Sequence, residues 1–167
     1  MAESIRDLHE RGVGDAFISW FNAQHGTSYS FAQRGGDPPD VLYRDGSKTL
    51  PLEITTAYYD AADARARWKI ARHDPDAPTG WSGFDANTKL IENIRSIIVD
   101  KCLGQHDPGT LLVISIYPAV TTAEEVDTLL EGISISARNP FDGIFLIGNF
   151  GISSSGGRSG YQVWKFG

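Results

Sequence analysis

Apolar residues near the start of the chain follow the spacing of an amphipathic helix. Over residues 5–24 they recur at intervals of three and four positions, which places them on one helix face. Gly26 then supplies a C-terminal cap. Gly12 and Gly14 weaken the middle of this helix, so a break there is the alternative to one continuous helix.

Three further helices are predicted. The most regular apolar stripe of the sequence covers residues 86–102. An alanine-rich segment at 58–72 is also expected to be helical, and the prolines and glycines of 73–83 predict a loop after it. A capping-box pattern predicts a short helix within 121–130.

The first three predicted strands include a hairpin. Residues 27–33 alternate between polar and apolar and carry aromatic side chains, as is typical of a half-buried strand. Residues 40–43 and 50–56 predict two further strands, and Asp45-Gly46 between them is a common hairpin turn. These two strands are therefore expected to pair antiparallel.

The second half of the chain carries three more predicted strands. The runs at 111–116 and 141–147 are almost continuously apolar, which indicates strands covered on both faces. Residues 161–166 alternate as an edge strand, and the Ser- and Gly-rich stretch at 153–157 predicts a flexible loop before it. The 111–116 strand is expected at the centre of the sheet.

The order of these elements predicts an α/β fold. It consists of a mixed central sheet with an antiparallel hairpin, a right-handed helical crossover into a parallel strand, and helices on both faces. The chain has 167 residues, of which 41% are hydrophobic and 22% charged, enough apolar material for one compact core. Without an internal repeat or a linker, residues 1–167 are expected to form a single domain.

Charge and cysteine content narrow the classes of function. The formal net charge of −6 repels polyanions, so nonspecific coating of nucleic acid is not expected. Cys102 is the only cysteine and cannot form an internal disulfide, and the four histidines lack zinc-ligand spacing. No apolar run approaches the roughly 20 residues of a membrane helix, and the first residues are too polar for a secretory signal. We therefore expect a cytoplasmic protein without membrane contact.

Two acidic residues fall on the predicted hairpin. Asp40 follows a proline and opens one strand. Glu53 starts the run Glu53-Ile54-Thr55 in the partner strand. With the helix and buried strand that follow, this pattern resembles the PD-(D/E)XK nuclease superfamily, over roughly residues 10–147 in element order. The resemblance implies a restriction-endonuclease-like fold and a magnesium-dependent endonuclease that cuts DNA, or RNA.

The same residue types suit a metal ion on physical grounds. A hard divalent ion such as Mg²⁺ or Mn²⁺ prefers oxygen ligands and keeps several waters. Asp40 and Glu53 are expected to supply carboxylates and Ile54 its carbonyl oxygen, on rigid strands. An ion held there would serve phosphodiester hydrolysis. The alternative is that Glu53 lies on the solvent face of its strand and Asp40 merely ends the preceding turn.

The lysine of the superfamily, two residues after the glutamate, is Thr55 in this chain. Some members place an equivalent lysine on the following helix. A right-handed crossover is expected to bring the first turn of that helix, with Lys89, close to Glu53. Lys101 is about three turns further along and is the poorer candidate, and Lys69 is the second choice. For Lys89 the alternative is an ordinary surface lysine.

Other residues are candidates for supporting roles. The resemblance implies an acid on the first helix that assists the metal site, for which Glu10 is the first candidate and Asp15 the reserve. The residues predicted to contact nucleic acid are Arg65, Arg67, Trp68 and Arg72. A solvated helix face explains that basic segment equally well.

Three functions stay open from the sequence. The first is a metal-dependent nuclease acting on DNA or RNA, as a monomer or a homodimer. The second is a catalytically inactive nuclease-fold module that binds a partner, which Thr55 and the acidic net charge favour. The third is a small-molecule-binding α/β domain unrelated to nucleases. Convergence of Asp40 and Glu53 with a lysine would separate the first from the others.

Overall fold

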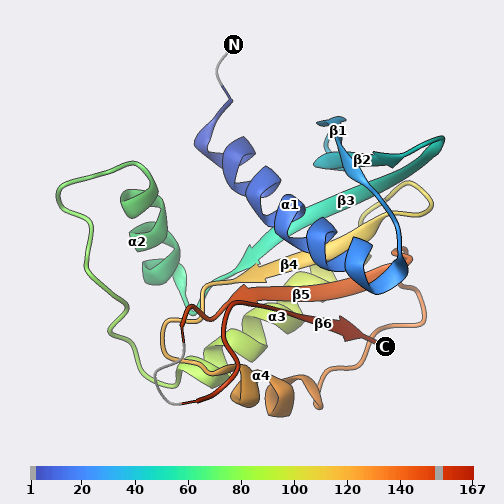
Figure 1. The fold of residues 1–167 in the computed structure, drawn as a ribbon. Helices are drawn as coiled ribbons and strands as arrows, with labels where there is room; N and C mark the ends of the chain where they lie inside the picture. The colour runs from blue at the N-terminus through green and yellow to red at the C-terminus, as the bar shows by residue number, and fades with distance from the viewer. Residues whose placement is uncertain (1–2, 153–155) are drawn as a thin grey trace.

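A six-stranded mixed sheet forms the centre of the molecule (Figure 1). The structure, a computed structural model, describes residues 3–152 and 156–167. The strands, in spatial and chain order, are β1 (Ser30–Arg34), β2 (Val41–Asp45), β3 (Lys48–Ala57), β4 (Leu111–Ile116), β5 (Gly143–Asn149) and β6 (Tyr161–Phe166). β3, β4 and β5 are parallel, and the other neighbours pair antiparallel. The predicted mixed sheet, with its hairpin and its parallel crossover, is confirmed.

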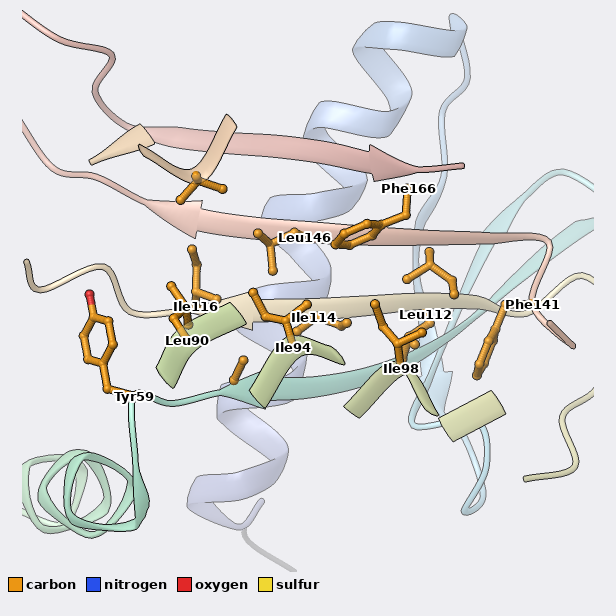
Figure 2. Packing of buried hydrophobic residues seen from close by; sticks show 13 residues of the cluster. Tyr59, Leu90, Ile94, Ile98, Leu112, Ile114, Ile116, Phe141, Leu146 and Phe166 are labelled. Carbon is orange, nitrogen blue, oxygen red and sulfur yellow. The ribbon is translucent and has the colours of Figure 1, made fainter. Parts of the chain in front are cut away.

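Helices cover both faces of the sheet (Figure 1). They are α1 (Ile5–His25), α2 (Ala61–Ala71), α3 (Ala86–Cys102) and α4 (Ala123–Leu130). Phe17 of α1 packs on one face with Val113 of β4, whereas Ile94 of α3 and Val126 of α4 pack on the other face with Ile114 (Figure 2). Successive β4 residues thus enter opposite cores, as a central strand requires. Among the helices of the described residues, none combines the length and hydropathy needed to cross a membrane.

The first helix runs without a break through both of its inner glycines. It ends at Gly26, whose φ of 63° and N–H bond to Asn22 form the expected cap. A Cβ at Gly14 would lie 2.5 Å from the Tyr43 hydroxyl, so glycine allows α1 to approach β2 closely. A Cβ at Gly12 would meet nothing within 4 Å. The alternative of a break is therefore wrong.

Several predicted boundaries differ from the structure, and the first strand begins at Ser30 rather than at residue 27. The 58–72 helix begins later, because the Asp60 carboxylate caps the N–H of Asp63 and fixes the start of α2. The strand predicted at 141–147 is shifted to Gly143–Asn149, and Phe141 packs into the α3 core just before it. Residues 153–155 of the predicted loop lie outside the described residues.

Gly12 and Gly14 provide a matched test of this packing. Gly14→Ala places a methyl group against the buried Tyr43 side chain, so we expect the free energy of unfolding to fall by about 1–3 kcal/mol. Gly12→Ala meets no atom and gains helix propensity, so we expect a rise of up to about 1 kcal/mol. Urea denaturation measures both. Equal stabilities would contradict the close approach of α1.

Candidate active site

β3 continues beyond the point where β2 separates from it. The ladder between them ends at Val41 and Leu52, while β3 runs on to Ala57. Just before β2, Asp40 donates its N–H to the Leu52 carbonyl, and its Oδ2 accepts the Ile54 N–H at 2.8 Å. The N–H and C=O of one strand residue point to the same side, so the Ile54 carbonyl also faces this edge. A carboxylate and a carbonyl oxygen therefore meet there.

Glu53 lies on the α3 side of the same edge. Its side chain is 3% exposed, and the Nζ of Lys101 lies 2.5 Å from its Oε1. Its Oε2 is buried without a hydrogen-bond partner among the described residues. Asp40 is also buried. The alternative that Glu53 lies on a solvent face is therefore wrong, and Asp40 is buried and bonded to β3.

The direction of α3 explains why Lys101 reaches Glu53. Since β3 and β4 are parallel, the helix between them runs back, and its last turn lies near the start of β4, where Leu112 pairs with Glu53. Glu53 lies within β3 rather than at its carboxyl end. Lys89 begins about 18 Å earlier along the helix and contacts Asp60 instead. The predictions that Lys89 lies nearest to Glu53 and that Lys101 is the poorer candidate are both wrong.

Glu10 reaches this region from α1, but two arginines hold its oxygens. Arg6 Nε lies 2.6 Å from Oε1, and Arg34 Nη2 lies 2.7 Å from Oε2. Arg6 also lies 3.8 Å from Asp40. The two arginines were not predicted, although the four-residue spacing of Arg6 and Glu10 indicates one helix face. Asp15, the reserve candidate, instead accepts a bond from a tyrosine hydroxyl of β2.

The carboxyl of Asp40 is hard to ionise in this setting. Burial raises its pKa to about 6, because the charged form loses hydration. The Ile54 N–H opposes this by stabilising the anion, and the negative charges of Glu53 and Glu10 raise the pKa further. The Lys101 ammonium lowers it only in part. A cation placed beside Asp40 would favour the ionised form.

The donor set at this edge fits a hard divalent ion. Asp40, Glu53 and the Ile54 carbonyl present oxygen atoms, which Mg²⁺ and Mn²⁺ prefer. A cation would also satisfy the orphaned Oε2 of Glu53. Within residues 3–152 and 156–167, no group of three or more His, Cys, Asp or Glu side chains could hold a metal ion. The fit is therefore to two carboxylates and a carbonyl, with other positions left to waters or phosphate oxygens.

A cavity of about 240 Å³ adjoins the open edge. Residues from three helices and β3 line it, among them Arg6, Glu10, Ile54, Thr55, Trp68 and Lys101. Thr55 lies on the same face of β3 as Glu53. The side chain that places a positive charge beside Glu53 comes from α3 instead. Lys69, the second choice for that cation, is exposed on α2 and is not among the lining residues.

The predicted nucleic-acid residues are only partly brought together. Arg65, Trp68 and Arg72 have the spacing of one helix face, and both arginines are exposed. Arg67 is directed elsewhere, with its Nε 3.2 Å from the buried Asp63 carboxylate. Three of the four predicted residues thus have the spacing of one helix face, and Trp68 among them lines the cavity.

The function of this protein has to be inferred from the geometry of the site. The chain matches no protein-family model, no curated protein and no solved structure. Two buried carboxylates, an adjoining carbonyl and one lysine are the features to be explained.

Asp40→Asn is expected to stabilise the metal-free protein at neutral pH. The carboxyl pKa is about 6 in the fold against 3.8 ordinarily, so ionisation opposes folding increasingly as the pH rises through this window. We expect the variant to gain about 2–3 kcal/mol over the parent at pH 8, and the gain to vanish near pH 4. Denaturation in EDTA across this range measures it. A gain that grows toward low pH would contradict the assignment.

Proposed function

We propose that this protein is a metal-dependent nuclease that hydrolyses phosphodiester bonds of DNA, with an active site of the PD-(D/E)XK type. The observation that carries the proposal is that the buried carboxylates of Asp40 and Glu53 both flank the open edge of β3, Asp40 bonded to the Ile54 N–H and Glu53 paired with Lys101. Asp40 is a buried acid with a raised pKa close to a cavity, which is typical of functional sites.

Each group has a defined part in this proposal. Asp40, Glu53 and the Ile54 carbonyl would hold Mg²⁺ or Mn²⁺. When bound, the ion supplies Lewis-acid chemistry, which lowers the pKa of a water and offsets negative charge on the scissile phosphate. Lys101 donates one N–H to Glu53 and has two further donors for a phosphate oxygen or the attacking water. Lys101 would thus have the role of the superfamily lysine, whose position in this chain is occupied by Thr55.

The local charge supports a polyanionic substrate despite the net charge of −6. Arg6 and Lys101 line the cavity, where they pair with Glu10 and Glu53, and Arg65 and Arg72 are exposed on the segment that carries Trp68. Trp68 presents an aromatic surface between them that suits base stacking. These residues would hold a strand by its phosphates and bases without sequence readout.

The cleavage test compares two lysines of the same helix. We expect Lys101→Ala to reduce cleavage of plasmid and single-stranded DNA in Mg²⁺ or Mn²⁺ by about 100-fold or more, as loss of a charge-stabilising donor does. Lys89→Ala is the matched control and is expected to be nearly silent, because it contacts Asp60 outside the site. Glu53→Gln is expected to abolish cleavage.

Folding has to be separated from chemistry in this comparison. Lys101→Ala leaves a buried carboxylate unpaired, which can destabilise the fold. Lys101→Gln keeps an N–H donor, on a side chain one atom shorter, and removes the charge, so it is expected to fold and still lose cleavage. A parent inactive with either ion would refute the nuclease proposal and favour the inactive binding module. Parent-like cleavage by Lys101→Gln would refute the role of Lys101.

Metal binding gives a second, independent measurement. Two carboxylates and a carbonyl leave much of the coordination shell to water, so we expect weak Mn²⁺ binding without substrate. Isothermal titration calorimetry is expected to show this binding in the parent and its loss in Asp40→Ala and Glu53→Ala. Lys101→Gln removes no oxygen ligand and is expected to keep it. Unchanged binding in both carboxylate variants would remove these residues from the site.

A further inference from the structure

A second and larger cavity lies on the α1 face of the sheet. Its volume is about 440 Å³, which is within the range of ligand pockets. It is lined by α1 and by the carboxyl ends of β4 and β5, with Gly12, Ser115, Tyr117, Asn149 and Tyr161 among the lining residues. The carboxyl ends of parallel strands are the usual place for ligands in open α/β sheets. The metal site proposed above uses none of these residues.

The chemistry of this cavity favours a neutral ligand. Among the described residues that line it, none is an acid, a lysine or an arginine. His9 also lines it, and burial lowers the pKa of this imidazole below its ordinary value, which disfavours its charged form. A phosphate, carboxylate or ammonium group would find no counter-charge here. The lining therefore suits an uncharged ligand portion.

Aromatic rings and polar edges favour a flat heterocycle. His9 stacks on Tyr117 with ring centroids 5.8 Å apart, and its Nδ1 lies 2.9 Å from the Tyr117 hydroxyl. Tyr161, 57% exposed, presents a second phenol ring at the cavity. Ser115 and Asn149 add hydroxyl and amide groups to otherwise apolar walls. A planar ring that stacks on aromatic faces and hydrogen-bonds at its rim suits this lining.

His9 joins this cavity to the candidate active site. It lines both cavities, and its Nε2 lies 3.0 Å from Oγ1 of Thr56 on the open edge of β3. One cavity offers Arg6 and Lys101 for a phosphate, and the adjoining one is uncharged and aromatic. We propose that the larger cavity binds one nucleobase of the strand whose phosphate lies at Asp40 and Glu53. This inference rests on the proposed function for the placement of the strand, because the phosphate is assigned to the proposed metal site. Binding of the base itself can be measured without cleavage.

Gly12 allows the cavity to be filled without disturbing the core. It lines the cavity, and a Cβ there would meet nothing within 4 Å. Gly12→Leu adds a side chain at the wall of this cavity and replaces a poor helix former by a good one. Ala23→Leu adds a comparable side chain at an exposed position of α1 that does not line the cavity, and it is the matched control.

The test uses 2-aminopurine fluorescence in EDTA, where no cleavage occurs. The probes are 2-aminopurine riboside and a single-stranded oligothymidylate with one central 2-aminopurine. We expect the parent and Ala23→Leu to quench the oligonucleotide strongly, and Gly12→Leu to lose affinity roughly tenfold or more, as expected for loss of one stacked base. The free riboside is expected to bind at the same place with lower affinity, because it lacks the phosphates.

Each outcome separates this inference from the nuclease proposal. Equal quenching by Gly12→Leu and the parent would refute base binding in the cavity, whatever the cleavage results. Binding of the riboside without binding of the oligonucleotide would refute insertion of a strand base and indicate a free-nucleoside site. The inference is supported if Gly12→Leu weakens oligonucleotide binding and Glu53→Gln leaves it intact. This holds even if the parent shows no cleavage.

Discussion

The hydrogen bond between Asp40 and Ile54 determines how this edge of the sheet is built. β2 ends its pairing at Leu52, and the Asp40 carboxylate accepts the Ile54 N–H that a longer β2 would have bonded. The rest of β3 can then continue beside β4 with its other edge open to α1 on one sheet face and α3 on the other. Glu10 reaches this edge from α1, and Lys101 reaches it from α3. A single backbone donor thus positions the first acid and leaves room for the other groups.

Charge is concentrated at this edge at a cost to the fold. Glu10, Asp40 and Glu53 are all buried, and removing a carboxylate from water is unfavourable unless it is paired or hydrogen-bonded. Glu10 has two arginine partners, but Asp40 has a backbone donor and only a distant guanidinium, and one oxygen of Glu53 has no partner among the described residues. The two carboxylates that lack full pairing, Asp40 and Glu53, are those to which the proposal assigns a metal ion. A purely structural edge would be served better by apolar residues.

The sequence predicted most elements because their signals are local. Apolar periodicity reports which face of a helix or strand is buried, and Asp45-Gly46 specifies its own hairpin turn. Asp40 and Glu53 could be predicted as a pair because that hairpin alone brings them opposite one another. Lys101 could not, because its place depends on how far Glu53 lies from the end of β3 and where β4 begins. Those offsets are set by packing between segments far apart in the chain.

The same geometry explains how threonine can occupy position 55. A lysine two residues after Glu53 would lie on the same face of β3, since side chains alternate along a strand. That face is covered by α3, whose last turn lies at the level where β4 pairs with Glu53. A long side chain from this turn therefore reaches the glutamate from the facing layer, and Lys101 does so. In the proposed active site, a lysine from the last turn of α3 would therefore take the place of a lysine at position 55, although the two positions are far apart in sequence.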